Sequence, residues 1–258
     1  MKISFTTMAT PELSVSEQFA VARAYGFDSI DLRMMVRGGG EISENLTQEE
    51  ADAIVKASQG IEIASLLCYN EKVESGKETM SASLRLHMEL AKKLRIPMIR
   101  IFTGKLETAA AQEQLVEILK DVLQSDQTGT KIAMQNHLNS SVTLHQALEV
   151  CKAVGHPRLS IIASPDHSVL IAEEYLSLLP ELAPYTSQLY VADMNENRKA
   201  VLPGQGIMPF DQILRSLRDN GFDGSVSFKW ERCWHPEIQP YETAFAAFVP
   251  WIRELCGN

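Results

Sequence analysis

The sequence predicts an α/β fold, a single (β/α)8 TIM barrel in which residues 1–258 form one domain. Eight short apolar or β-branched runs alternate strictly with eight segments of helical spacing, and 258 residues is a usual length for such a barrel. Strict alternation favours parallel strands joined by right-handed helical crossovers. A doubly wound open sheet is the structural alternative, but no GxGxxG motif follows the first strand.

The expected strands are short runs bounded by Gly, Pro, Asn or Asp. They lie at residues 3–7, 29–33, 61–69, 98–103, 131–136, 159–163, 189–193 and 225–230. The expected helices carry apolar residues at spacings of three and four. They lie at residues 16–25, 48–58, 79–94, 109–123, 144–154, 173–182, 210–220 and 241–255.

Connections between these elements differ in chemistry at the two ends of the predicted barrel. Glycine follows several of the expected helices, as at Gly26 and Gly155, which is typical of a helix C-terminus. The loops that follow strands are longer and more polar, notably 38–40, 139–141 and 193–209. In a (β/α)8 barrel these loops form the mouth, where the chemistry takes place.

Composition excludes several classes of function. A net charge of −9 opposes nucleic acid as a partner, and no apolar run is long enough to span a membrane. The first residues show no export signal, so we expect a soluble cytoplasmic protein. Four scattered cysteines form no CxxC pair, which argues against disulfides and a thiolate zinc site. A polyhydroxylated small-molecule substrate is the expected partner, and the sequence leaves a homodimer open.

Polar residues gather where the fifth and sixth predicted strands end. Gln135 and His137 close the fifth strand, and alternation points Gln135 inward if Ala133 also points inward. Asp166 and His167 follow the sixth strand, a pairing suited to acid/base chemistry or metal ligation. Asp166 could equally be the N-cap of a helix, and the sequence leaves both interpretations open.

The seventh and eighth strands contribute a second group of polar residues. Asp193 ends the seventh strand, and a rigid Pro-Gly-Gln-Gly segment follows at 203–206. Alternation places Lys229 of the eighth strand on the face opposite Phe228 and Trp230. A lysine that points into a barrel is costly unless it is paired or functional, so Lys229 is the leading mechanistic candidate. The alternative is a lysine at a solvated rim.

Two segments resemble motifs of the xylose isomerase-like sugar phosphate isomerase/epimerase family. Residues 202–210, LPGQGIMPF, are similar to its PGxGxxxF loop, and residues 217–224, LRDNGFDG, to its L-x-x-x-G-[YF]-D-G turn. The resemblance implies the TIM barrel and a divalent cation held by Glu, Asp, His and Glu from strands five to eight. Here those positions correspond to Gln135, Ser164, Tyr190 and Lys229.

These substitutions remove three carboxylates and add a cation, so we expect no metal cofactor. The Lys229 ammonium would stand near the place of the metal, hydrogen-bonded by Gln135, Ser164 and Tyr190. There it would orient a substrate oxygen, or serve as a base or Schiff-base nucleophile if its pKa were lowered.

The resemblance and the polar residues together predict an isomerase or epimerase that acts on a sugar or sugar-derived keto compound by metal-independent proton transfer. A catalytically silent sugar- or partner-binding barrel and a keto-sugar lyase or dehydratase are the alternatives. An apurinic endonuclease is disfavoured by the acidic charge and by missing His and Asp ligands. The catalytic candidates are Lys229, His137, His167 and Asp193. The substrate-binding candidates are Arg33, Asn70, Arg100, Gln135, Ser164, Tyr190, Arg198, Glu231 and Trp234.

Overall fold

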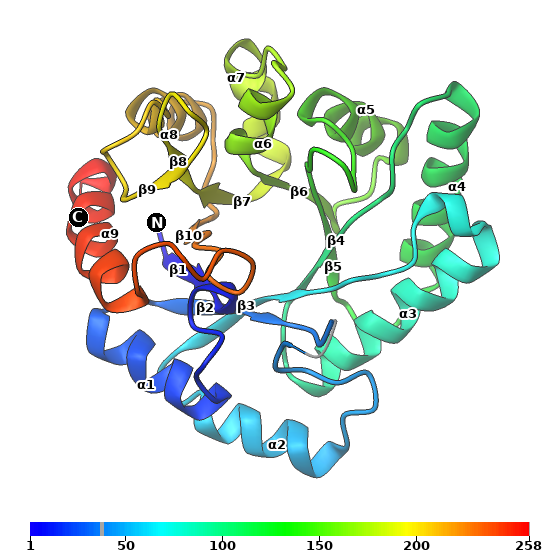
Figure 1. Cartoon of the computed structure of the whole chain (residues 1–258). Helices are drawn as coiled ribbons and strands as arrows, with labels where there is room; N and C mark the ends of the chain where they lie inside the picture. The colour runs from blue at the N-terminus through cyan, green and yellow to red at the C-terminus, as the bar shows by residue number, and fades with distance from the viewer. Residues whose placement is uncertain (37–38, 258) are drawn as a thin grey trace.

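The computed structural model describes residues 1–36 and 39–257, and eight of its strands close into a parallel barrel ringed by helices (Figure 1). Neighbouring strands follow the order β1-β10-β7-β6-β5-β4-β3-β2, which confirms the predicted (β/α)8 topology. The barrel strands are β1 (Ile3–Thr6), β2 (Ser29–Arg33), β3 (Glu62–Leu67), β4 (Met98–Ile101), β5 (Lys131–Gln135), β6 (Leu159–Ala163), β7 (Thr186–Val191) and β10 (Ser225–Phe228).

Seven long helices surround the barrel close to their predicted positions. They are α1 (Val15–Tyr25), α2 (Gln48–Ala57), α3 (Lys77–Lys93), α4 (Ala109–Ser125), α5 (Leu144–Val154), α8 (Phe210–Asp219) and α9 (Tyr241–Cys256). Capping boxes start α1, α2 and α5, and left-handed Gly26 and Gly155 end α1 and α5 as expected. None of the helices described here has the length and apolar character that a membrane span requires.

The sixth predicted helix, at 173–182, is wrong as a continuous element. The structure instead has α6 (Pro165–Leu170), η3 (Leu176–Leu178), α7 (Leu179–Leu182) and η4 (Ala183–Tyr185). Ala172 adopts a left-handed conformation with φ of 53°, which ends α6. Pro180 then lies in the first turn of α7, because a proline deeper in a helix would remove a backbone hydrogen bond.

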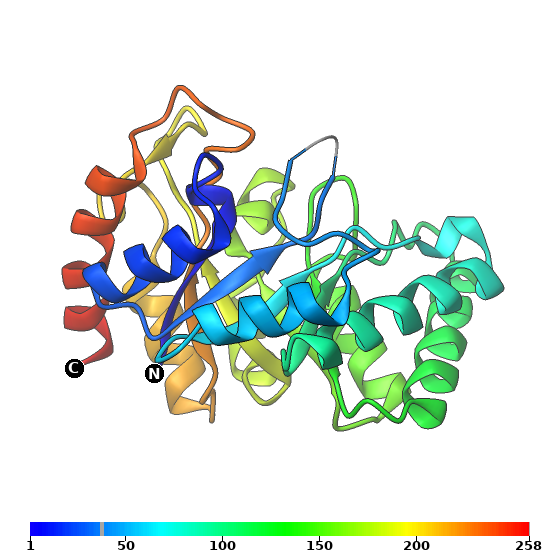
Figure 2. The ribbon, with the colours of Figure 1, turned by 90° about the horizontal axis from the view of Figure 1, so that it is seen from below.

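Several segments of the barrel mouth are more ordered than the sequence predicted. Three-residue 3₁₀ helices follow the first and third strands as η1 (Thr7–Ala9) and η2 (Val73–Ser75). The expected loop after β7 contains an antiparallel hairpin of β8 (Asp193–Met194) and β9 (Ala200–Val201). Figure 2 shows this hairpin beside the segment that joins β10 to α9, on the side opposite the chain termini. Of the expected glycine loop 38–40, Gly38 lies outside the described residues.

The barrel interior is built in layers along the strands. One layer is apolar apart from a phenol and consists of Met8, Leu67, Met98, Ala133, Ile162 and Tyr190. Two residues earlier along β2 than Arg33, the buried carboxylate of Asp31 accepts hydrogen bonds from Ser4, Ser65, Ser227 and Gln188. Burial raises the pKa of Asp31, although these four donors favour its charged form. Along the barrel towards the mouth, the inward side chains are therefore first polar, around Asp31, then apolar, and finally polar again.

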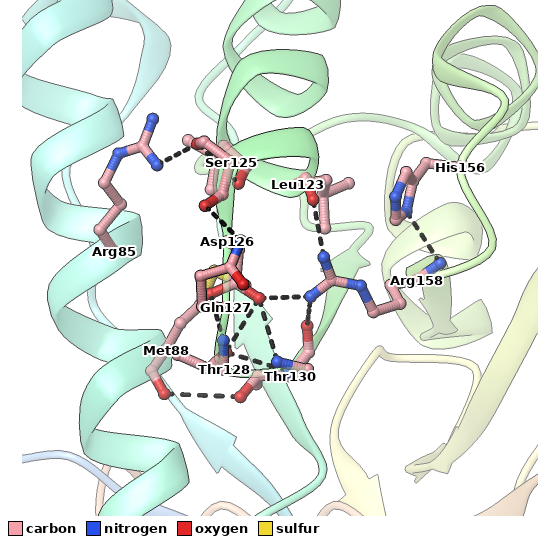
Figure 3. Close-up of polar contacts among 12 residues, drawn as sticks. Arg85, Met88, Leu123, Ser125, Asp126, Gln127, Thr128, Thr130, His156 and Arg158 are labelled. Atoms are coloured by element: carbon pink, nitrogen blue, oxygen red, sulfur yellow. Dashed lines mark hydrogen bonds and ion pairs between the residues drawn. The ribbon is translucent and has the colours of Figure 1, made fainter.

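An ion-pair cluster at the end of the barrel away from the mouth joins α4 to β6 (Figure 3). Arg158 pairs with Asp126 and also donates to the carbonyls of Leu123, at 2.6 Å, and Thr130, at 3.1 Å. Asp126 accepts from both the amide and the hydroxyl of Thr128. Because each charge has several hydrogen-bond partners, this cluster holds the loop between α4 and β5 in place.

Candidate functional site

Lys229 directly follows β10, and its side chain points into the barrel as strand alternation predicted. Its backbone amide donates to the Val191 carbonyl at 2.9 Å, while Phe228 and Trp230 pack in the outer core. The ammonium nitrogen lies 2.6 Å from Asp166 Oδ2 and 3.0 Å from His167 Nε2. The side chain is only 1% exposed. Lys229 is therefore paired inside the barrel and is not a solvated rim lysine.

Lys229 and Asp166 form a charged pair. Burial favours the neutral form of Lys229, but Asp166 and Glu231 outweigh it and raise the pKa of the ammonium group. Burial alone would likewise raise the pKa of Asp166, yet Lys229 and His167 hold it at about 2. Both groups are charged at neutral pH, so Lys229 acts as a fixed positive charge and is poorly suited to be a nucleophile.

The conformation of the β6–α6 connection aims Asp166 at Lys229. Ser164 occupies the N-cap position of α6, and Asp166 lies in the first turn, so the N-cap interpretation of Asp166 is wrong. The Ser164 hydroxyl donates to Asp166 Oδ1 at 2.7 Å. Asn136 braces this turn, because its side chain donates to the Ser164 carbonyl and accepts from the Ser164 amide. The bracing role of Asn136 was missed from the sequence.

The expected hydrogen-bond partners of the Lys229 ammonium differ from those in the structure. Asp166 and His167 occupy the positions that Gln135, Ser164 and Tyr190 were predicted to take. Ser164 contacts Asp166 instead, and Gln135 lines a cavity at the mouth. Tyr190 is fully buried in the apolar layer, where burial raises the pKa of its hydroxyl. Its hydroxyl has no hydrogen-bond partner within residues 1–36 and 39–257.

Two histidines lie beside the ion pair, with ring centroids 4.1 Å apart. Burial, and then the positive charge of Lys229, lower the pKa of His137 to about 4 and that of His167 to about 3. Both rings are therefore neutral at pH 7. Because the ammonium of Lys229 donates to Nε2 of His167, the proton of this neutral ring is assigned to Nδ1.

Two cavities open at the mouth and share Glu231 as a lining residue. The first has a volume of about 420 Å³, within the range of small-molecule sites. Its walls combine aromatic, amide and charged side chains: Tyr69, Phe102, Trp234, Asn70, Gln135, His137, Lys72, Arg100 and Glu231. The second, of about 660 Å³, lies between the β8–β9 hairpin and the segment after β10, and Lys229 and Arg198 are among its lining residues.

The predicted substrate-binding residues of strands two to four have distinct environments. Arg100 lines the smaller cavity and is 2% exposed. Arg33 is also buried, and its guanidinium carbon lies 5.7 Å from the ring centroid of Trp234. Asn70 uses its amide to bridge backbone groups, since it donates to the carbonyls of Glu71 and Phe102 and accepts from the Phe102 amide. Asn70 therefore shapes the wall that it lines.

Asp193, expected as a catalytic residue, has its carboxylate committed to the backbone. It accepts hydrogen bonds from the amides of Gly204 at 3.0 Å, Gly206 at 2.9 Å and Met208 at 3.3 Å. A Cβ at Gly206 would lie 2.0 Å from Asp193 Oδ1, which explains the glycine. Through these hydrogen bonds Asp193 holds the 202–210 loop in its conformation. Asp193 does not pair with Lys229, whose ion pairs within the described chain are with Asp166 and Glu231.

Comparisons with known proteins place the chain in a family. The family model described as the xylose isomerase-like TIM barrel matches residues 19–255. The chain belongs to this family. An inosose isomerase of Halalkalibacterium halodurans is 23% identical over 251 residues, covering 88% of this chain and 86% of that protein.

Two solved structures share the xylose isomerase-like fold with TM-scores of 0.79. The IOLI protein with a binding zinc atom is 18% identical and aligns with 99% of this chain, over 98% of its own length. A D-psicose 3-epimerase, determined in the presence of D-fructose, is 15% identical, with 100% of both chains aligned. At these identities the structural matches establish the fold.

The divalent metal site that the xylose isomerase-like family implies does not fit the residues at this mouth. Within residues 1–36 and 39–257, no group of three or more His, Cys, Asp or Glu side chains is arranged to hold a metal ion. The ammonium of Lys229 contacts Asp166 and His167, the two nearby groups best suited to be ligands. A cation at this place would lie beside the ammonium, so these side chains do not fit the family's divalent metal site.

Proposed function

We propose that the protein is a sugar or keto-sugar isomerase or epimerase that moves a proton without a divalent metal. The observation that carries this proposal is the buried Lys229 ammonium, held by Asp166 and His167 beside the mouth cavities. The inosose isomerase and D-psicose 3-epimerase named above support the reaction class. Metal independence rests on the mismatch between the family's ligand set and Lys229.

Lys229 is suited to stabilise negative charge on a substrate oxygen. An ammonium group has three N–H donors, and two of them are directed to Asp166 and His167. Glu231 Oε2 lies 3.8 Å away, beyond hydrogen-bond distance, so the third donor is available to a substrate. In a buried site, a fixed cation stabilises an enediolate more than it would in water.

The proton would pass between the substrate and Glu231, which lines both cavities. A carboxylate removes the proton from the carbon that carries the hydroxyl, and the C–H electron pair moves into the adjacent C–C bond as the carbonyl π pair moves onto oxygen. A proton delivered to the opposite face gives the epimer, and it must come from a second donor or from water, because Glu231 reaches only the face that it deprotonates. Returning the proton to the former carbonyl carbon, with transfer of the hydroxyl proton, gives the isomer.

His137 and His167 would support this step in different ways. His137 accepts a weak hydrogen bond from the Asn139 amide through Nδ1, at 3.4 Å, so its Nε2 is assigned as a donor that can bind a substrate hydroxyl. His167 positions the ammonium of Lys229. Gln135 and Trp234 would contact the polar and apolar faces of a sugar, because both line the smaller cavity.

Two other functions remain as alternatives with their own supporting observations. A catalytically silent sugar- or partner-binding barrel is favoured by the change of all four metal-ligand positions of the family. A keto-sugar lyase or dehydratase would use the same carbanion chemistry but expel a hydroxyl group after the proton is removed. Its supporting observation is that a carboxylate, Glu231, and the neutral imidazole of His137 line one cavity.

Proton exchange tests the proposal and does not require the product to be identified. The protein would be incubated in D2O with inososes, ketoses and 3-keto-glycosides, with and without a chelator, and deuterium incorporation followed by NMR. We expect incorporation at the carbon next to the carbonyl, unaffected by chelator and lost in Lys229→Met.

Each alternative gives a different result in this experiment. A dehydratase would form an unsaturated ketone with strong ultraviolet absorbance. A silent barrel would bind ligand but exchange no proton. Exchange that stops on chelation would contradict the metal-independent part of the proposal.

A further inference from the structure

Arg100 of β4 is a buried cation that has no counter-ion among residues 1–36 and 39–257. Its side chain is 2% exposed, and it forms no ion pair with any carboxylate in the described part of the chain. It donates one hydrogen bond to the described residues, from Nη1 to the Cys68 carbonyl at 3.0 Å, and the hydroxyls of Tyr69 and Tyr190 are neutral polar neighbours of its guanidinium. Its Nε is buried and has no acceptor among the described residues.

Aromatic contacts hold the Arg100 guanidinium in place without neutralising it. The guanidinium carbon lies 4.1 Å from the ring centroid of Phe102 and 5.4 Å from that of Tyr69. Cation–π contacts of this kind offset part of the cost of removing a guanidinium from water, but they provide no hydrogen-bond acceptor. Stacking therefore leaves the planar donor edge of Arg100 available at the wall of the smaller cavity.

The charges around the smaller cavity sum to a positive value in an acidic protein. Lys72 and Arg100 line it with two positive charges, and Glu231 contributes one negative charge. The adjacent Lys229 and Asp166 neutralise each other. The cavity thus holds one net positive charge, whereas the whole chain carries −9. Because field lines concentrate in a cavity with low-dielectric walls, a small anion would be attracted to this place.

We propose that the ligand of this site carries a carboxylate or phosphate group, which Arg100 binds through its guanidinium with help from Lys72. The inference deepens the proposed function, because the anionic end of the same molecule would lie at Arg100 and its reacting oxygen would lie at Lys229. Guanidinium groups bind planar carboxylates and phosphates through paired N–H donors, which explains an arginine at this position. The substrate class is then a sugar acid or a sugar phosphate.

Calorimetry with matched probes tests the proposal. D-gluconate and D-glucose 6-phosphate are the anionic probes, and D-glucose is the neutral probe of similar size. We expect one of the anions to bind more tightly than D-glucose, and more weakly as salt is added. Tighter binding of gluconate would identify a carboxylate ligand, and tighter binding of the phosphate a phosphorylated one.

Variants of Arg100 separate recognition from packing. We expect Arg100→Met to weaken the preferred anion by about 10- to 100-fold, the usual worth of hydrogen bonds to a charged group, with D-glucose affinity unchanged. Arg100→Lys retains the positive charge but loses the planar pair of N–H donors, so it should give an intermediate affinity. Arg215→Met is the matched control, because Arg215 is an exposed residue that pairs with Asp211 on α8.

The outcomes distinguish this inference from the proposed function. Equal binding of anion and neutral sugar, or equal anion affinity in wild type and Arg100→Met, would overturn the anion site even if proton exchange is observed. Anion binding that depends on Arg100, in a protein that exchanges no substrate proton, would support the anion site and contradict the isomerase. Circular dichroism and the melting temperature of Arg100→Met show that the variant is folded, and Arg100→Lys provides the test if it is not.

Discussion

The ammonium nitrogen of Lys229 lies 2.6 Å from Asp166 Oδ2, and the two side chains are 1% and 7% exposed. This pair joins the end of β10 to the first turn of α6, which are 63 residues apart in the chain. Removing two charges from water is expensive, and an ion pair buried in this way often contributes little net stability. The arrangement is better explained by the fixed charge that it presents to the cavities.

Lys229→Met is expected to lower the free energy of unfolding by about 3 to 5 kcal/mol, because it leaves Asp166 buried and unpaired. The double variant Lys229→Met/Asp166→Asn should recover part of this stability, since neither charge remains. Proton exchange should be absent from both variants. Urea denaturation and the D2O assay measure the two effects, and a double variant with normal exchange would show that the ammonium is structural only.

Wild-type protein is expected to bind Mn²⁺ no more tightly than an ordinary acidic surface does, because Lys229 occupies the centre of the donor set. Lys229→Glu should create a divalent-cation site with Asp166, His167 and Glu231. The neutral variant Lys229→Gln is the control for removal of the ammonium alone. Calorimetry with Mn²⁺ checks both statements, and one tight stoichiometric site in the wild-type protein would contradict the first.

Stability should decrease on acidification because His137 and His167 are held neutral. Their pKa values of about 4 and 3 lie below the unfolded value of about 6.5, so the unfolded chain binds more protons between these limits. The free energy of unfolding is therefore highest, with respect to these two histidines, above about pH 6.5, and it decreases as the pH falls towards 4. At about 1.4 kcal/mol for each unit of pKa shift, we expect each histidine to contribute a loss of about 3 kcal/mol by pH 4.

Comparison with a variant isolates the histidine contribution to this pH dependence. His137→Asn/His167→Asn should show a flatter dependence between about pH 6.5 and pH 4 when measured by urea denaturation. The pKa of Asp166, about 2, also lies below its unfolded value of about 3.9, so its stabilisation is lost only as the pH falls below about 4. Parallel curves for wild type and variant would refute the assignment to the two histidines.

Gly206→Ala is expected to displace the loop after β7 by steric contact alone. The added Cβ would lie 2.0 Å from Asp193 Oδ1 and 2.4 Å from the Met194 carbonyl oxygen, so the backbone must move. We expect a loss of about 1 to 3 kcal/mol in unfolding free energy and weaker ligand binding in the larger cavity.

Gly60→Ala is the control for this loop displacement. Gly60 has a φ of 83°, so an alanine there costs about 1 kcal/mol of backbone strain, but its Cβ would meet nothing within 4 Å. Gly60 precedes β3, at the end of the barrel away from the mouth, so ligand affinity should be unchanged. Equal ligand affinities for the two variants in calorimetry would contradict the steric explanation.

The structure differs from the predicted elements in places where the spacing of apolar residues does not reveal the conformation of the backbone. The segment 173–182 has helical spacing, but left-handed Ala172 separates it from α6, and Pro180 lies in the first turn of the separate short helix α7. The hairpin β8–β9 has two residues per strand, too few for alternation to be recognised in a sequence. The hairpin lies on the mouth side of the barrel, where loops have more varied conformations than the strands.

The barrel and the inward direction of Lys229 follow from the amino-acid order, because hydrophobic periodicity and strand alternation are local properties. The partners of the ammonium do not: Asp166 and His167 surround it in the folded chain, whereas Gln135, Ser164 and Tyr190 were expected there. The partner of a buried charge depends on how a helix turn and a strand end meet across the barrel. That meeting is set by the closure and packing of all eight strands, which no local spacing encodes.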